Sequence, residues 1–207
     1  MKNALFNILV IFSLSFTLSL SAAASPEIGA EAPAFTATTS NGQEISLESF
    51  RGKPVMLEWT NHDCPFVRKH YESGNMQRTQ RSLTEEGVVW LSVISSAPGE
   101  QGHVSPNEAN ALTTSRGAYA NHVILDPSGT IGRLYAAKTT PHMFLIDEEG
   151  ILKYMGAIDD RPSARASSLE GATNYVLAAW EALKSGEAIE NTNTKPYGCS
   201  VKYSAGH

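Results

Sequence analysis

The sequence predicts an α/β fold in which a central mixed β-sheet is flanked by helices, with an N-terminal hairpin and a C-terminal tail. Two observations support this prediction. Short apolar segments typical of buried strands alternate with longer segments of helical periodicity. The last part of the pattern is a hairpin followed by a helix, and a hairpin adds antiparallel strands to parallel ones. The order therefore predicts a mixed sheet with helices on both faces.

The first predicted elements are a small hairpin and the central strand of the sheet. Residues 36–39 and 44–47 flank the dipeptide Asn41-Gly42, which is a typical hairpin connection. The run at residues 55–59 is short, mostly apolar and bounded by turn residues. These properties predict a buried strand in the middle of the sheet.

The middle of the chain predicts a long helix and two more strands. The helix spans roughly residues 65–86, with a proline at its first position, where the missing N–H costs nothing. Gly74 is a point at which this helix can be interrupted. Buried strands are predicted at residues 88–95 and 123–125.

A capping box opens the next predicted helix. Ser105, Pro106 and Glu108 supply a hydroxyl at the N-cap, a proline at the first helical position and a carboxylate at the third. We expect this helix to reach about Arg116.

The closing elements are a hairpin and a helix. Residues 143–147 and 151–158 flank a turn and predict two antiparallel strands. Residues 174–185 have apolar side chains at helical spacing and end at Gly186. These elements complete the predicted sheet and its helical cover.

The N-terminus has the pattern of an export signal. Lys2 precedes an uncharged, mostly apolar run over residues 4–20, and the small residues 21–24 follow it. A membrane anchor is the alternative, but a run of about 17 residues is at the short limit for spanning a bilayer. We therefore expect cleavage near Ala24 and a periplasmic or secreted protein with no membrane-spanning segment.

Three parts of the chain are expected. Residues 1–24 form the signal peptide, and the remainder is long enough for a single domain with a sizeable core. We place this domain at residues 25–190. Residues 191–207 are expected to form an exposed tail that carries Cys199, because the sequence leading to this cysteine is polar.

Composition narrows the function classes. The formal net charge is −5, and the basic residues are scattered along the chain. This distribution argues against nucleic acid or an anionic membrane as the main partner. Cys64 and Cys199 are the only cysteines, which are too few for a disulfide scaffold or a four-cysteine zinc site. We expect a small molecule or another protein as the partner and no bound cofactor.

Cys64 is the predicted centre of the chemistry, because it follows a buried strand and precedes a helix. Helix N–H groups and the helix dipole stabilise a thiolate there, which lowers the pKa from its ordinary value of about 8.5. A protonated His62 would add to this effect and Asp63 would oppose it. A small buried hydrophobic side chain is the alternative role, but polar neighbours at a strand end favour a reactive cysteine.

Several segments carry a family resemblance. They include Gly29-x-x-Ala32-Pro33-x-Phe35, Gly52-Lys53-Pro54, Asn61-His62-Asp63-Cys64-Pro65-Phe66-Val67, Thr140-Pro141-His142, Gly156-Ala157-Ile158-Asp159-Asp160 and Gly198-Cys199-Ser200. Together these segments resemble the redoxin branch of the thioredoxin superfamily. They are most similar to its peroxiredoxin-like group, of the AhpC/TSA type, which carries an N-H-x-C-P-[FY]-V active-site turn.

The resemblance implies a thioredoxin-like fold and an oxidoreductase in which Cys64 attacks a peroxide or a disulfide. It also implies that Pro141 is a cis-proline whose preceding backbone faces Cys64, whereas a trans proline at a strand start is the alternative. The residues expected to shape the site are Thr60, Asn61, His62, Pro65, Thr140, Pro141 and His142.

Two positions depart from the family patterns. Val67 stands where thioredoxins have a second cysteine, so no local disulfide can form. Asn61 stands where peroxiredoxins have threonine or serine, and Thr60 precedes it. Cys199 is therefore the one internal candidate to resolve an oxidised Cys64, after which an external thiol would reduce the disulfide. A permanent structural disulfide is the alternative role of the pair.

A binding module without turnover is the second hypothesis for this site. Cys64 with His62 or His142 would then hold a protein partner or a metal such as copper, which soft sulfur and nitrogen ligands suit. The cysteine pair of metal-carrying relatives is absent, so we predict no metal in the leading hypothesis.

Overall fold

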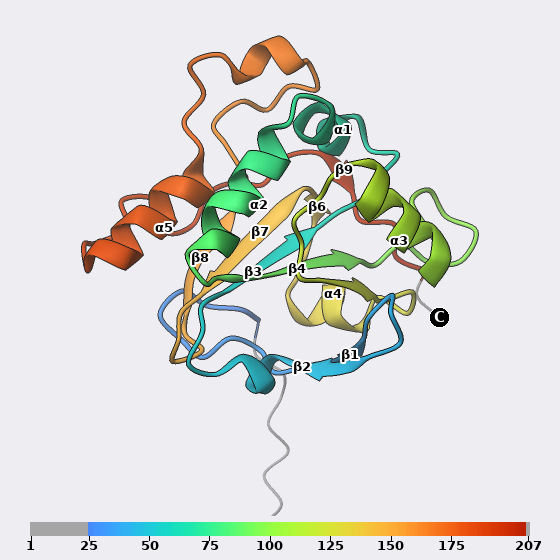
Figure 1. The fold of residues 1–207 in the computed structure, drawn as a ribbon, viewed down its shortest axis with the longest axis horizontal. Coiled ribbons are helices and arrows are strands. Elements are labelled where there is room, and N and C mark those ends of the chain that lie inside the picture. The colour runs from blue at the N-terminus through green and yellow to red at the C-terminus, as the bar shows by residue number, and fades with distance from the viewer. Residues whose placement is uncertain (1–24, 206–207) are drawn as a thin grey trace, which may run out of the picture.

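A computed structural model describes residues 25–205 and confirms the predicted α/β architecture. The central sheet has five strands in the order β5-β4-β3-β7-β8 (Figure 1). β3 (Val55–Trp59), β4 (Val89–Ile94) and β5 (His122–Leu125) pair in parallel. β7 (His142–Ile146) pairs antiparallel with β3, and β8 (Leu152–Gly156) pairs antiparallel with β7. The predicted signal peptide lies outside the described residues.

Helices cover one face of this sheet. α1 (Pro65–Glu72), α2 (Asn75–Glu85) and α5 (Tyr175–Ser185) lie over it, with α3 (Pro106–Ser115) toward the β5 edge (Figure 1). The apolar side chains of α1, α2 and α5 form one buried cluster with the sheet, which includes Met56, Val67, Met76, Leu83, Trp90, Met143, Leu145 and Val176, whereas α3 packs in a smaller, separate cluster. Among residues 25–205, no helix has the length and apolar character needed to cross a membrane.

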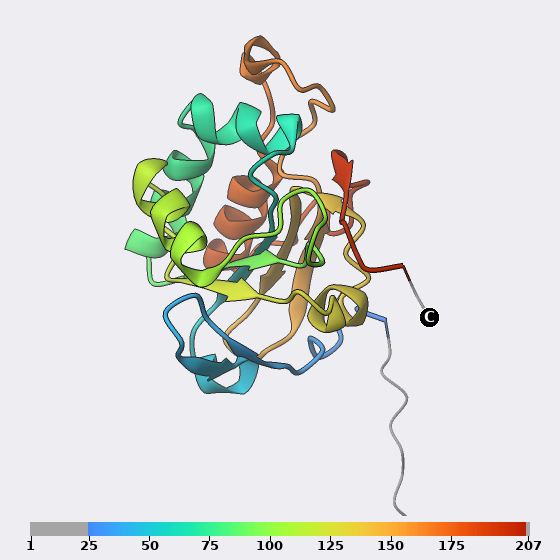
Figure 2. The ribbon, with the colours of Figure 1, turned by 90° about the vertical axis from the view of Figure 1, so that its right-hand side faces the viewer.

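The opposite face is covered by the N-terminal hairpin and by α4 (Thr130–Leu134). The hairpin consists of β1 (Thr36–Thr38) and β2 (Glu44–Ser46), followed by the short helix η1 (Leu47–Phe50), and Figure 2 shows it on the other side of the sheet from α1 and α2. Successive side chains of a strand point to opposite faces. Leu57 and Trp59 therefore pack on this side, whereas Glu58 faces the helices.

Several predicted boundaries agree with the structure. The Ser105 hydroxyl accepts the N–H of Glu108, and the Glu108 carboxylate accepts the N–H of Ser105, so the capping box is present. Asn174 caps α5 with its side chain, and Gly186 ends the helix in a left-handed conformation. Local sequence signals therefore predicted these helix ends.

The helix predicted over residues 65–86 is two helices. α1 ends at Glu72, and Gly74 has a φ of +72° before α2 begins at Asn75. An L side chain rarely adopts this φ, so glycine permits the break. α1 is consequently a separate helix of eight residues that begins directly after Cys64.

The segment predicted as an exposed tail is half-buried for much of its length. The N–H of Met155 donates to the carbonyl oxygen of Thr192 at 3.0 Å, and the N–H of Thr194 donates back at 3.1 Å. Farther on, β9 (Cys199–Ser200) pairs antiparallel with β6 (Thr139–Thr140). Polar composition predicted exposure, but backbone hydrogen bonds hold the segment whatever its side chains are.

A buried carboxylate lies in the central strand. Glu58 accepts hydrogen bonds from the hydroxyls of Tyr71 and Ser92, the amide of Gln80 and the indole N–H of Trp90. Burial raises the pKa of Glu58, because the charged form loses its hydration, and the four donors oppose part of this rise. Within residues 25–205, the carboxyl group is therefore satisfied by hydrogen bonds alone, with no cation paired to it.

We predict that the Glu58→Gln substitution removes a pH-dependent part of the stability. The folded-state pKa of Glu58 is raised above its ordinary value of 4.5, so the native protein binds this proton more tightly than the unfolded chain. The contribution of Glu58 is fully present below pH 4.5 and is lost as the pH rises through the folded-state pKa. The difference in unfolding free energy, wild type minus variant, should fall over this range.

Urea unfolding at a series of pH values measures that difference. The Glu85→Gln variant is the control, since Glu85 is exposed on α2. A difference that does not change with pH for Glu58→Gln would contradict the raised pKa.

Candidate functional site

Cys64 lies where β3 gives way to α1, as the sequence predicts. It is the N-cap of α1 with an extended backbone conformation, and Pro65 occupies the first helical position. The free N–H groups of the first turn therefore point toward its side chain. The Cys64 side chain is completely buried.

Asn61 shapes the turn between β3 and α1. Its Oδ1 accepts the N–H of Asp63 at 2.9 Å, and its Nδ2 donates to the carbonyl oxygen of Gln101 at 3.1 Å. Both ends of the amide are thus engaged in loop structure. Asn61 orients the backbone next to Cys64 and does not direct a free polar group at the sulfur.

The tail strand brings Cys199 to Cys64. The register of β6 and β9 pairs Thr140 with Cys199. The Cys64 thiol donates to the carbonyl oxygen of Thr140, with its Sγ at 3.2 Å, and also shares a hydrogen bond with the Cys199 thiol. The peptide bond from Thr140 to Pro141 is cis, as the resemblance implies. Both cysteines are free thiols in this structure.

Gly198 permits this close approach, a role that is not evident from the sequence alone. Its φ is +135°, and a Cβ at this position would lie 2.0 Å from the carbonyl oxygen of Thr140. Only glycine suits both the backbone angle and the space. A glycine directly before the second cysteine was the available signal, although it does not reveal which backbone lies opposite.

The two thiols differ in acid strength. Burial by itself raises the pKa of Cys64. Hydrogen bonds from the Cys199 thiol and from the N–H groups of Val67 and Cys199, together with the nearby Thr140 hydroxyl, outweigh burial, and the pKa is lowered on balance. Burial, the hydrogen bond to Cys64 and the thiolate charge raise the pKa of Cys199 to about 12. Of the two thiols, Cys64 is therefore the one that ionises more readily, and Cys199 keeps its proton and donates to it.

His142 points away from Cys64, contrary to the suggestion that it joins Cys64 in a binding site. Its Nδ1 accepts the N–H of Lys138 at 3.3 Å, and its ring packs on Phe144 with centroids 4.4 Å apart. Phe144 belongs to the cluster on the face opposite to α1, because strand alternation places both rings there. Burial, with a smaller effect of the Lys138 charge, lowers the pKa of His142 to about 3.

The described residues do not supply the ligand set that the metal-binding hypothesis requires. His62 Nε2 lies 3.4 Å from the carboxylate of Asp63, and its Nδ1 is buried without a hydrogen-bond partner among the described residues. Within residues 25–205, no three His, Cys, Asp or Glu side chains gather in a group that could hold a metal ion.

The Gly198→Ala substitution should separate the two cysteines. The added methyl group overlaps the Thr140 carbonyl oxygen, so we expect a loss of stability of about 1–3 kcal/mol and less Cys64–Cys199 disulfide after mild oxidation. Gly186→Ala is the matched control, because it has a φ of +69° but no atom within 4 Å of the added Cβ. An unchanged disulfide yield in Gly198→Ala would refute the role given to this contact.

The thiols should also titrate apart. Ultraviolet absorbance of the thiolate, followed against pH, should show one group ionising below the ordinary cysteine pKa and one well above it. The Cys64→Ser variant should lose the transition at low pH. Two transitions in the ordinary range would be incompatible with the hydrogen bonding described.

The chain is similar to known proteins of the peroxiredoxin type. The model of the AhpC/TSA family matches residues 28–155. A protein of Coxiella burnetii named "Putative peroxiredoxin bcp" is 29% identical over 135 residues, which are 61% of this chain and 85% of that protein. These relatives support an oxidoreductase activity. The matched range contains Cys64 and Pro141 but ends before Cys199.

Two crystal structures share the fold. A hypothetical protein from Sinorhizobium meliloti has a TM-score of 0.71 at 24% identity, covering 88% of this chain and 98% of its own. An uncharacterized conserved protein from Geobacillus kaustophilus has a TM-score of 0.73 at 21% identity, covering 87% and 94%. The fold is thioredoxin-like. Because the family model matches more than half of this chain, the chain belongs to the AhpC/TSA family.

Proposed function

We propose that this protein is an exported thiol-dependent oxidoreductase. The Cys64 thiolate attacks a small peroxide or disulfide, and Cys199 resolves the product. The pairing of Thr140 with Cys199 supports this proposal, because it sets a protonated thiol against the thiolate at the start of α1. The signal-like pattern of residues 1–24 supports export.

The first step is attack on an O–O or S–S bond. With a hydroperoxide, an S–O bond forms at Cys64 as the O–O bond breaks, which yields a sulfenic acid and an alcohol or water. With a disulfide, an S–S bond forms as another breaks, which yields a mixed disulfide and a thiolate. Either way the Cys64 sulfur is oxidised and the substrate is reduced.

Cys199 completes the reaction. It gives up its proton and attacks the Cys64 sulfur, so that water or a thiol leaves and the Cys64–Cys199 disulfide forms. The Cys64 thiolate is one cause of the raised pKa of Cys199. Oxidation of Cys64 removes that charge, and the Cys199 pKa then falls when its thiolate is needed. An external thiol reductant returns both cysteines to the starting state.

The burial of Cys64 favours a small substrate. Its side chain has no exposed surface, and β9 lies beside it. The disulfide of a folded protein would have to displace this strand to reach the sulfur. Hydrogen peroxide or a small-molecule disulfide requires a much smaller opening.

Stopped-flow mixing of the reduced protein with hydrogen peroxide, and separately with glutathione disulfide, tests this function. We expect at least one oxidant to react far faster than with free cysteine and to produce the Cys64–Cys199 disulfide. Cys64→Ser should abolish the fast phase. Cys199→Ser should keep it but stop at a sulfenic acid or a mixed disulfide, which mass spectrometry identifies.

Two results would reject the proposal. One is a rate no faster than that of free cysteine with both oxidants. The other is a wild-type disulfide that resists strong reductant, since such a bond would be a permanent structural link.

A further inference from the structure

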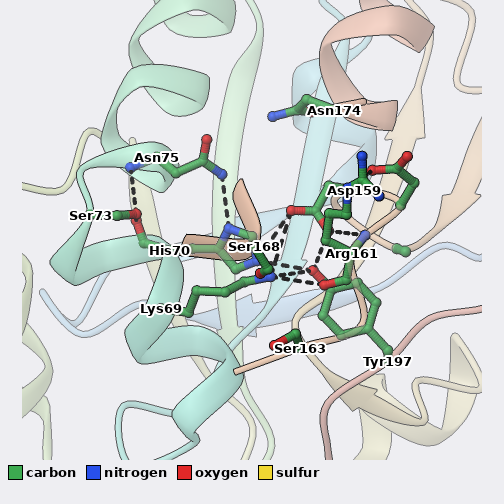
Figure 3. Close-up of polar contacts among 12 residues, drawn as sticks. Lys69, His70, Ser73, Asn75, Asp159, Arg161, Ser163, Ser168, Asn174 and Tyr197 are labelled. Carbon is green, nitrogen blue, oxygen red and sulfur yellow. Dashed lines mark hydrogen bonds and ion pairs between the residues drawn. The ribbon is translucent and has the colours of Figure 1, made fainter. Parts of the chain in front are cut away.

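A buried polar cluster connects the tail to α1. Figure 3 shows Lys69 and His70 of α1 converging with Asp159, which follows β8, and with Tyr197 of the tail. The exposed fractions of Lys69, His70 and Asp159 are 2%, 0% and 2%. The reaction proposed above uses none of these side chains. Tyr197, however, is two residues from Cys199.

The Tyr197 hydroxyl is the centre of this cluster, and its hydrogen-bonding capacity is full. It donates to the carboxylate of Asp159 and accepts from Lys69 Nζ at 3.1 Å. It also lies 3.2 Å from His70 Nε2. A phenol has one proton and two lone pairs, so Nε2 of His70 must donate. His70 Nδ1 then accepts from the amide of Asn75 at 2.8 Å.

The charges agree with this assignment. Burial, reinforced by the Lys69 ammonium, lowers the pKa of His70 to about 3, so the ring is neutral. Lys69 Nζ lies 3.8 Å from the Asp159 carboxylate and donates to the carbonyl oxygen of Arg161 at 3.0 Å. One cation and one anion are thus buried together, with Tyr197 hydrogen-bonded to both.

The Tyr197 ring makes apolar contacts with the same helix. It packs edge-on against Phe66 with centroids 5.8 Å apart, and the Lys69 ammonium lies 5.1 Å from its centroid. Phe66 is two residues past Cys64. Ring and hydroxyl therefore both hold the tail against the helix that begins at Cys64.

A second anchor lies on the other side of Cys199. The Tyr203 hydroxyl donates to the carbonyl oxygen of Ala137 at 2.8 Å. The N–H of Val201 donates to the carbonyl oxygen of Lys138 at 3.1 Å. These contacts hold the end of the tail beside α4 and β6. Of the two anchors, the one at Tyr197 contacts α1.

We propose that Tyr197, held by Lys69, His70 and Asp159, is the positioning residue that keeps Cys199 within reach of oxidised Cys64. This inference rests on the proposed function. The cluster does not contact the reacting sulfurs, so it acts by maintaining a high effective concentration of Cys199. Directional buried hydrogen bonds suit this task, because partial displacement would leave charged groups unpaired.

This role predicts unequal effects on the two chemical steps. Loosening the tail removes Cys199 from its place and slows resolution. It also removes the hydrogen bond from the Cys199 thiol to Cys64, but it uncovers Cys64 at the same time, so the first attack is slowed much less than resolution. A residue that only supported the fold would impair both steps together or neither.

The Tyr197→Phe variant tests this prediction, because it keeps the ring and removes the hydroxyl. After rapid mixing with glutathione disulfide, we expect the mixed disulfide on Cys64 to convert to the Cys64–Cys199 disulfide roughly tenfold more slowly. The rate of its formation should change much less, because easier access to Cys64 offsets the weakened hydrogen bond from the Cys199 thiol. The matched control is Tyr135→Phe, which removes a buried hydroxyl that donates to the Pro33 carbonyl oxygen at 2.8 Å on the opposite face. It should change neither rate.

The reduction potential of the Cys64–Cys199 disulfide gives a second readout that does not require turnover. In glutathione redox buffers, Tyr197→Phe should shift it to a less negative value, because a lower effective concentration weakens the disulfide. Asp159→Asn keeps the shape and removes the charge opposite Lys69. It should shift the potential in the same direction and decides the matter if Tyr197→Phe does not fold.

The outcomes separate the two proposals. Folded variants with wild-type resolution rate and potential would overturn the role of Tyr197 and leave the proposed function intact. A wild-type protein that never forms the Cys64–Cys199 disulfide would overturn the proposed function, and the role of Tyr197 with it.

Discussion

The packing of the Gly198–Cys199 backbone against the carbonyl oxygen of Thr140 is the contact on which the site depends. That oxygen accepts the Cys64 thiol at 3.2 Å and lies where any side chain at position 198 would be. A single backbone atom thus locates both cysteines. The central sheet supports it, since β7 begins just after the cis-proline and pairs with β3, whose end leads to Cys64.

The interior combines apolar packing with two buried, hydrogen-bonded polar clusters. Glu58 lies among four donors beneath the helices, and Lys69 and Asp159 are buried with Tyr197 at the tail. Buried polar groups are costly unless they are paired, so each cluster favours one arrangement of the elements around it. The second cluster extends this constraint to the segment that carries the second thiol. The difference in pKa between the two cysteines then depends on how closely the tail is held against α1.

Local sequence patterns predicted much of the fold, but they did not predict several contacts of the site. Strand 55–59 and the capping box at Ser105 were predictable because their signals lie in adjacent residues. The pairing of β6 with β9 was not, because two-residue strands have no periodicity and their register is set by tertiary packing. The burial of Lys69 and His70 was not predictable either, since burial of charge depends on partners that are distant in sequence.

Disulfide formation at increasing protein concentration tests most directly whether one chain positions both thiols. The wild-type protein is oxidised with one equivalent of oxidant, and the rate constant for conversion of oxidised Cys64 to its disulfide with Cys199 is measured. Positioning by the tail predicts a unimolecular step with a rate constant that does not depend on protein concentration. A rate constant proportional to concentration would show that cysteines of different molecules react, which would contradict the arrangement around Thr140.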